Sequence, residues 1–121
     1  MAAGKDKASI YVDLTVLFEF LYDAQWEVPK CHRIALINRI FDHCEKAISY
    51  FGVAFDIEPK RDEYVARMCE EFEALKICCR LAIKNGFYKK ESTKNTIRES
   101  IAKIQEGIDK WQSYLYSNRQ A

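Results

Sequence analysis

Glycine and proline are scarce in this sequence, with four glycines and two prolines among 121 residues. So low a content excludes collagen-like, low-complexity and loop-rich, disulfide-stapled chains. Long apolar runs are also missing, since none approaches the roughly 20 residues that a membrane-spanning helix needs. Residues 1–9 lack the apolar stretch of a secretory signal, so we expect a cytoplasmic protein with no membrane partner. This length predicts one domain that can bury a hydrophobic core.

Motifs of catalysis and of metal binding are missing as well. The odd number of cysteines and the lack of a C-x-x-C pair argue against structural zinc and favour free thiols in a reducing compartment. No glycine-rich phosphate loop, G-x-S-x-G or Glu-x-x-His pattern occurs. Glu70 and Glu73 could face His43 across a bundle, but such spacing is common on solvated helices. We therefore predict a protein that is not an enzyme, with no cofactor and no bound metal. The five cysteines are Cys31, Cys44, Cys69, Cys78 and Cys79.

Apolar residues recur at steps of three and four along nearly the whole chain, which is the spacing of amphipathic helices. The breaks fall at Pro29, around Pro59 and at Asn85-Gly86, and Ser92 or Thr93 can cap the last helix. Connections this short place consecutive helices side by side in opposite directions.

The sequence thus predicts an all-α protein, an antiparallel up-down-up-down four-helix bundle. The bundle should cover residues 9–118, with its first helix over about residues 9–26. Residues 1–8 are predicted to form a disordered N-terminal tail.

Large apolar residues at the helical positions define the predicted core. In the second segment the steps run through Ile34, Ile37, Phe41, Cys44, Ile48, Phe51 and Phe55. Across the bundle the predicted core residues are Leu17, Phe41, Ile48, Phe72, Leu75, Ile104 and Trp111. A second apolar set lies beside these positions and consists of Leu36, Ile40, Ala47, Tyr64, Ile77, Cys78, Leu81, Tyr114 and Tyr116. A stripe this wide indicates either deeply buried helices or a further surface that is buried between subunits, and we favour the subunit contact.

Charge is unevenly distributed, although 19 basic and 18 acidic residues leave a net charge of only +1. Residues 56–73 have a net charge of −4, whereas residues 74–98 have one of +6. The cations of this basic segment are Lys76, Arg80, Lys84, Lys89, Lys90, Lys94 and Arg98. The first three are four residues apart, which aligns them on one helix face, and Phe87 and Tyr88 follow in a loop. This arrangement predicts contact with an RNA backbone and some base stacking, or else an ordinary solvated surface that pairs with acidic neighbours.

Several short motifs follow one another in a characteristic order over about residues 12–115. They are Pro29-Lys30 with Arg33 and the run from Leu36 to Ile40, then Tyr64, Glu73-x-Leu75-Lys76, Arg80-Leu81-Ala82, and Ile101-x-x-Ile104 leading to Trp111. In order, spacing and total length they resemble the accessory variability determinant (Avd) family. Proteins of this family accompany the reverse transcriptase of diversity-generating retroelements.

The resemblance implies a four-helix bundle that assembles into a barrel-like homopentamer. It also implies a non-catalytic accessory protein that binds the reverse transcriptase and its template RNA and supports mutagenic retrohoming. Two features depart from the family. Gln105 and Asp109 occupy positions where members have glycine, so that only Gly107 remains small before Trp111. The chain is also nearly neutral, whereas members are strongly basic. A more distant likeness is to four-helix proteins encoded within intervening sequences of bacterial 23S ribosomal RNA genes. That likeness implies the alternative function, a structural interaction module with no nucleic-acid role.

Overall fold

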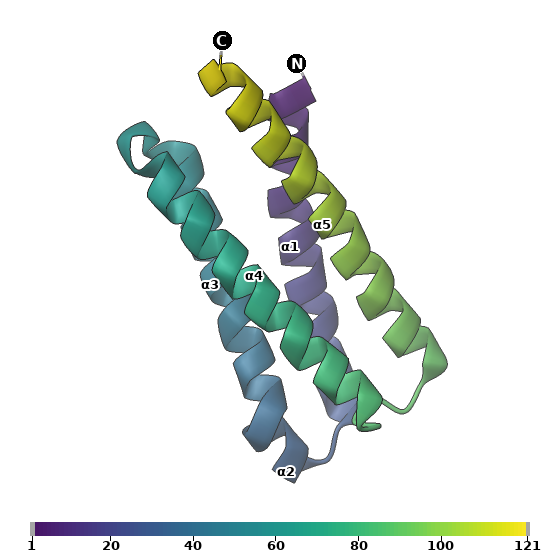
Figure 1. The fold of residues 1–121 in the computed structure, drawn as a ribbon. Helices are drawn as coiled ribbons and strands as arrows, with labels where there is room; N and C mark the ends of the chain where they lie inside the picture. Colours follow the sequence, from purple (N-terminus) through teal and green to yellow (C-terminus); the bar gives the residue numbers. More distant parts are fainter. Residues whose placement is uncertain (1, 121) are drawn as a thin grey trace.

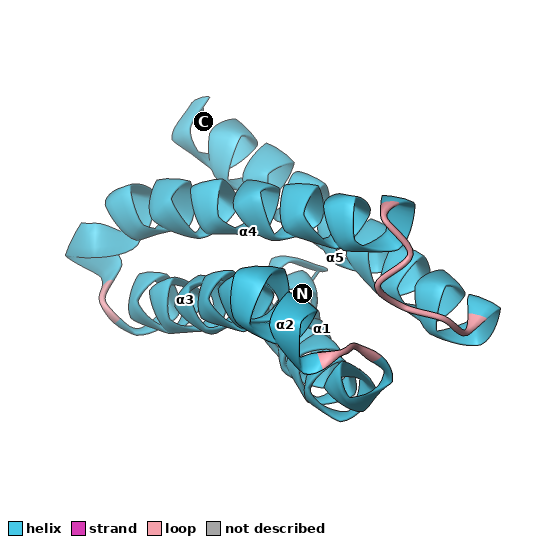
Figure 2. Ribbon diagram, turned by 90° about the horizontal axis from the view of Figure 1, so that it is seen from below, coloured by secondary structure: helices cyan, strands magenta, loops and turns pink. Residues whose placement is uncertain are grey.

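The computed structural model describes the backbone of residues 2–120 and the side chains of residues 9–113. Every regular element in this part of the chain is helical, which confirms the predicted all-α class. The long helices are α1 (Ala2–Ala24), α3 (Asn38–Asp56), α4 (Arg61–Lys84) and α5 (Glu91–Gln120). Figure 1 shows the chain reversing direction after α1, after α3 and after α4, and Figure 2 shows that only short loops interrupt the helices.

Four short elements lie between α1 and α4. Single turns of 3-10 helix, η1 (Gln25–Glu27) and η3 (Glu58–Lys60), lie at the end of α1 and before α4. A short helix α2 (Lys30–His32) starts after Pro29, as the sequence predicted, and continues through a π-helical turn η2 (Arg33–Ile37) into α3. The second predicted helix is therefore continuous, with a π-helical turn near its N-terminus.

Helix α1 begins earlier than the apolar spacing predicted. Its backbone is helical from Ala2, where we expected a disordered tail over residues 1–8. Alanine and lysine have high helix propensity, so this stretch can be helical without an apolar face. The correction concerns the backbone alone, because side chains before Ser9 lie outside the described residues.

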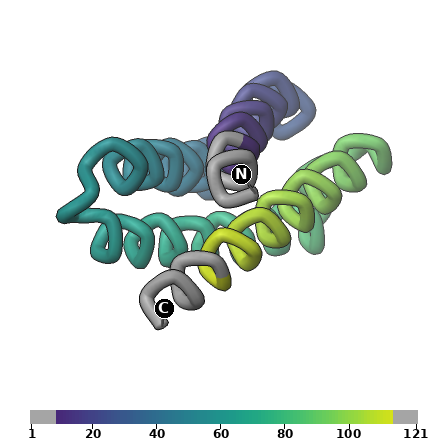
Figure 3. The backbone as a smooth tube through the Cα atoms, turned by 90° about the horizontal axis from the view of Figure 1, so that it is seen from above, coloured from purple at the N-terminus to yellow at the C-terminus, as the bar shows by residue number. Residues whose placement is uncertain are grey.

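The four long helices pack as two pairs around a shared core. Helix α3 packs along α4, and α5 packs along α1 (Figure 3), while α1 also contacts α3. Close approach of α5 to α1 depends on Gly107, because a β-carbon there would lie 3.1 Å from Cγ1 of Ile10. Helices α4 and α5, in contrast, have few contacts with each other. The bundle is thus open along the α4–α5 edge.

The predicted core is largely correct. Leu17, Phe72, Leu75, Ile104 and Trp111 are each no more than 1% exposed. All of the positions with core spacing in α4 are buried, and they are Val65, Met68, Phe72, Leu75, Cys79 and Ala82.

The predicted core face of α3 is only partly correct. Phe41 and Ile48, predicted as core, are only half-buried, and Ile34 is 64% exposed. Cys44 and Phe51 are buried as predicted, and the other buried side chains of this helix are Ile40, Ala47 and Ala54. The π turn at Arg33–Ile37 adds a residue and so changes the orientation of Ile34 relative to the helix that follows. Within α3, small alanines let neighbouring helices approach on a face that large residues do not mark.

The connection from α4 to α5 is fixed at both of its ends. Gly86 has a φ of 73°, and the amide of Phe87 donates to the carbonyl of Ala82 at 2.9 Å, which confirms the predicted Asn85-Gly86 cap. The start of α5 differs from the prediction, because the helix begins at Glu91. There the carboxylate of Glu27 accepts bonds from the amide of Lys90 and from the hydroxyl of Thr93, so the end of α1 is tied to the start of α5.

Candidate nucleic-acid interface

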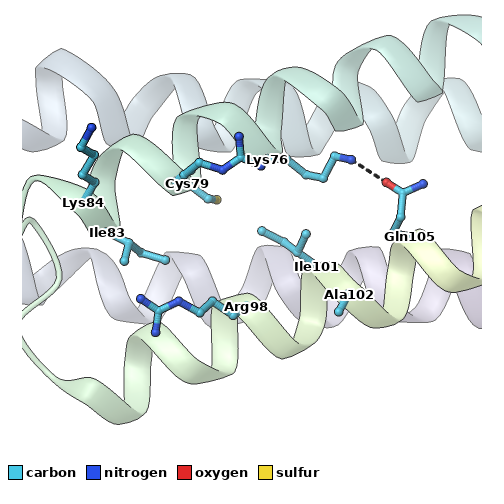
Figure 4. A pocket seen from close by; sticks show the side chains of 9 residues that line it. Lys76, Cys79, Ile83, Lys84, Arg98, Ile101, Ala102 and Gln105 are labelled. Carbon is cyan, nitrogen blue, oxygen red and sulfur yellow. Dashed lines mark hydrogen bonds between the residues drawn. The ribbon is translucent and has the colours of Figure 1, made fainter.

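A groove follows the open edge between the C-terminal half of α4 and the first half of α5. Its volume is about 490 Å³. Apolar atoms of Cys79, Ile83, Ile101 and Ala102 line it, and Figure 4 shows Ile83 and Ile101 pointing toward each other from the two helices. Basic side chains stand around this apolar surface, and the groove therefore combines charge with a hydrophobic interior. The remaining lining residues are Lys76, Arg80, Lys84, Arg98 and Gln105.

Four of the seven predicted binding residues meet at this groove. Lys76, Arg80 and Lys84 approach it from α4, at the predicted spacing of one helical turn, and Arg98 approaches it from α5. Lys89 and Lys90 are exposed in the loop that joins the two helices. Lys94 does not line the groove. Hereafter "basic groove" means the cavity together with Lys76, Arg80, Lys84 and Arg98.

Three of the seven cations already have partners within the chain. Nζ of Lys76 lies 2.6 Å from a carboxylate oxygen of Glu73 and donates at 2.6 Å to the side-chain oxygen of Gln105 across the groove (Figure 4). Lys94 and Arg98 both pair with Glu91, at 3.3 and 3.6 Å. These contacts lower the positive charge that a ligand would meet. Fewer than the seven predicted cations can therefore offer an unneutralised charge to a ligand.

The other four cations are available. Arg80, Lys84, Lys89 and Lys90 are exposed, and no described carboxylate lies within ion-pair distance of their side chains. By contrast, Arg67 in the acidic half of α4 pairs with Glu63 at 2.8 Å. Unneutralised charge is therefore concentrated at the C-terminal end of α4 and in the following loop. A polyanion would be attracted to this end of the bundle.

Burial and stacking within the protein limit the base-stacking role that the sequence predicted for the aromatic residues of the loop. Tyr88 is fully buried, its hydroxyl has no hydrogen-bond partner among the described residues, and burial raises its pKa. Phe87 is stacked on His32, with ring centroids 4.2 Å apart and an angle of 12° between the planes. The ring of Tyr88 and the face of Phe87 that lies against His32 are therefore closed to a base. Both rings instead anchor the loop to the body of the bundle.

One exposed aromatic residue at this end escaped the sequence analysis. Trp26, in the turn η1, is 68% exposed, and Cζ of Arg33 lies 4.8 Å from the centroid of its ring. A sequence signal existed, because Trp26 lies outside the apolar spacing of the first helix and three residues before a proline. Its exposure was not predicted.

The acidic residues considered for metal binding are not brought together. Nδ1 of His43 lies 2.7 Å from a carboxylate oxygen of Glu71, a partner that we had not considered. Glu70 and Glu73, which we had considered, are exposed. Among the described residues there is no group of three or more side chains that could hold a metal ion.

All five cysteines are free thiols. Burial raises the pKa of Cys44 to about 12 and also raises the pKa of Cys79 at the groove. Both therefore stay protonated at neutral pH and are poor nucleophiles. Across the described residues, no helix is both long and apolar enough to cross a membrane.

Fold and site together define the class, an all-α helical bundle with a basic groove along an open edge. Comparison of the chain with protein-family models, with curated proteins and with solved structures gave no significant match. Function is therefore argued from the basic groove and from the resemblance in the sequence.

Proposed function

We propose that this chain is a non-catalytic accessory protein that binds RNA at the basic end of its bundle. The observation on which this depends is that Arg80 and Lys84 are exposed beside an apolar groove and have no described carboxylate partner. A cation that is not neutralised within the protein can neutralise a phosphate instead. Lys89 and Lys90 extend the charged surface into the loop.

The resemblance to the Avd family supplies the biological setting of the proposal. In that setting the RNA is the template of a diversity-generating retroelement, and the protein partner is the retroelement's reverse transcriptase. Four basic side chains contacting phosphates would be largely indifferent to base sequence. That property suits an adaptor, which must hold an RNA for a polymerase rather than read it.

Reversing two charges tests the RNA interface. We expect R80E/K84E to weaken binding of a labelled single-stranded RNA of about ten nucleotides by roughly tenfold or more, because two phosphate contacts become repulsive. Fluorescence anisotropy titration at one salt concentration measures the loss, and several unrelated RNA sequences should lose affinity to a similar extent. A circular dichroism spectrum and melting curve like those of the wild type show that the fold is intact.

The matched control reverses the same amount of charge elsewhere. Lys60 is exposed at the other end of the bundle, and Lys103 pairs with Asp13 on the α1 side of α5. K60E/K103E should bind RNA within about twofold of the wild type, because charge outside the site acts only through a screened field. Equal binding by R80E/K84E and the wild type would refute the proposed interface.

A second candidate, an interaction module without a nucleic-acid role, is favoured by apolar residues on the surface. Val12 and Val16 are 55% and 54% exposed on one face of α1, and Ile77 and Leu81 are 52% and 45% exposed on one face of α4. Paired exposed apolar residues of this kind typically mark a protein contact.

Both candidates lead us to expect a homo-oligomer, and the Avd resemblance specifies a homopentamer. Light scattering at micromolar concentration should give a mass near five times 14.2 kDa. V16E/I77E should lower that mass, because charge on each apolar face disfavours burial between copies. A monomeric wild type would contradict assembly, and another whole-number multiple would contradict the pentamer alone.

A further inference from the structure

Trp26 is the most exposed of the large apolar side chains among the described residues, at 68%. It lies in the turn η1 between α1 and α2, outside the hydrophobic core. The second tryptophan, Trp111, is 1% exposed and packs against Phe51 inside the bundle. A tryptophan with this much exposed surface contributes little to the core, and aromatic rings in such places are characteristic of binding surfaces.

One face of the Trp26 ring is covered and the other is open. Cζ of Arg33 lies 4.8 Å from the ring centroid, at the distance of a cation–π contact. Nε of Arg33 is buried and has no hydrogen-bond partner among the described residues, so its position is not explained by any other polar contact. With the guanidinium on one side and 68% of the residue still exposed, the opposite ring face is accessible to a planar ligand.

The turn that holds Trp26 is anchored on both sides. The carboxylate of Glu27 accepts from the amide of Lys90 at 3.2 Å and from the hydroxyl of Thr93. Val28, two residues after Trp26, is 2% exposed. The backbone that holds the ring therefore does not need to be ordered when a ligand arrives, which lowers the entropic cost of stacking.

The same bonds place Trp26 beside the basic end of the bundle. Its chain neighbour Glu27 touches Lys90, which together with Lys89 forms the exposed part of the α4–α5 loop. A nucleic acid whose phosphates lie along these lysines has an accessible aromatic face within reach of its bases. Phosphate-binding cations next to an open aromatic ring are the two components of single-strand recognition.

We propose that Trp26 stacks an unpaired base of the bound RNA, with the guanidinium of Arg33 behind the ring. The proposal rests on the RNA binding put forward above and adds a preference for single strands over duplexes. Bases in an A-form duplex already stack on each other, and their faces are closed to a side chain. Phosphate contacts alone would not produce such a preference.

Three variants test the platform. We expect W26A to lose roughly tenfold in affinity for a single-stranded RNA of about ten nucleotides, and W26F to retain most of the affinity because a smaller ring still stacks. Affinity for a duplex of equal length should change by less than about twofold in both variants, because no base stacks there. Y11A is the matched control, since Tyr11 is also an exposed aromatic, at 47%, but lies in the first half of α1, away from the basic end. Its affinity should equal that of the wild type.

Tryptophan fluorescence gives an independent readout. Because Trp111 is buried, only Trp26 can contact a base directly. Single-stranded RNA should therefore quench the emission of the wild type, and W26F, which retains Trp111, should show no quenching.

The outcomes separate this proposal from the one on which it rests. Wild-type affinity in W26A, with salt-dependent RNA binding retained, would overturn stacking and leave the RNA interface standing. Equal losses for single strands and duplexes would also overturn it, as would a change of oligomer mass in W26A, because either would make Trp26 a general or protein contact. Failure of the wild type to bind RNA would overturn both.

Discussion

Replacing Phe72 by alanine is expected to lower the free energy of unfolding by about 3–5 kcal/mol, the range found for large aromatic side chains removed from well-packed cores. Phe72 is 1% exposed on α4, and its ring also lies 5.5 Å from the ammonium of Lys76 at the edge of the basic groove. Removing the ring leaves a cavity where the helices meet. The rigid core cannot collapse to fill it completely.

Chemical denaturation followed by circular dichroism, at one fixed protein concentration, measures the loss. Glu70→Ala is the control on the same helix, because Glu70 is exposed, and its change should stay within about 0.5 kcal/mol. A Phe72→Ala variant as stable as this control would contradict the core that we describe.

How far the sequence predicts the fold differs between helices. In α4 every position with core spacing is buried, because the helix is regular and its longest series of apolar residues at steps of three and four faces the core. In α3 two faces are apolar, so spacing alone could not choose between them. The choice depends on the close approach that Ala47 and Ala54 permit, which is a matter of tertiary packing.

The candidate site was predictable where it depends on one helix. The four-residue spacing of Lys76, Arg80 and Lys84 was sufficient to place them along one face of α4, and that face lines the groove. The pairs Lys76–Glu73 and Lys94–Glu91 also follow from spacing, since residues three apart on a helix are neighbours.

Features that depend on contacts distant in sequence were not predictable. The groove exists because α4 and α5 stay apart, and their separation follows from the packing of each on another helix. The exposed ring of Trp26 next to Lys90 depends on a bond between Glu27 and a residue 63 positions later. No local pattern encodes that bond. The stacking of Phe87 on His32, which covers one face of the Phe87 ring, has the same long-range character.

The salt dependence of RNA binding is the second large expected effect. Four cations without described carboxylate partners, namely Arg80, Lys84, Lys89 and Lys90, are available for phosphates in each chain. Each contact with a single strand contributes about −0.7 to the slope of log affinity against log salt, so the slope should be about −3. Raising the salt from about 50 to about 200 mM should then weaken binding roughly 50-fold.

That slope is the most direct test of the central claim, that this end of the bundle binds RNA through its phosphates. The measurement is an anisotropy titration of the wild type with a single-stranded RNA of about ten nucleotides at several salt concentrations. We predict a slope near −3 for the wild type and for K60E/K103E, and one nearer −1.5 for R80E/K84E, which loses two of the four contacts. A wild-type slope near zero, or the same slope in all three proteins, would contradict the claim.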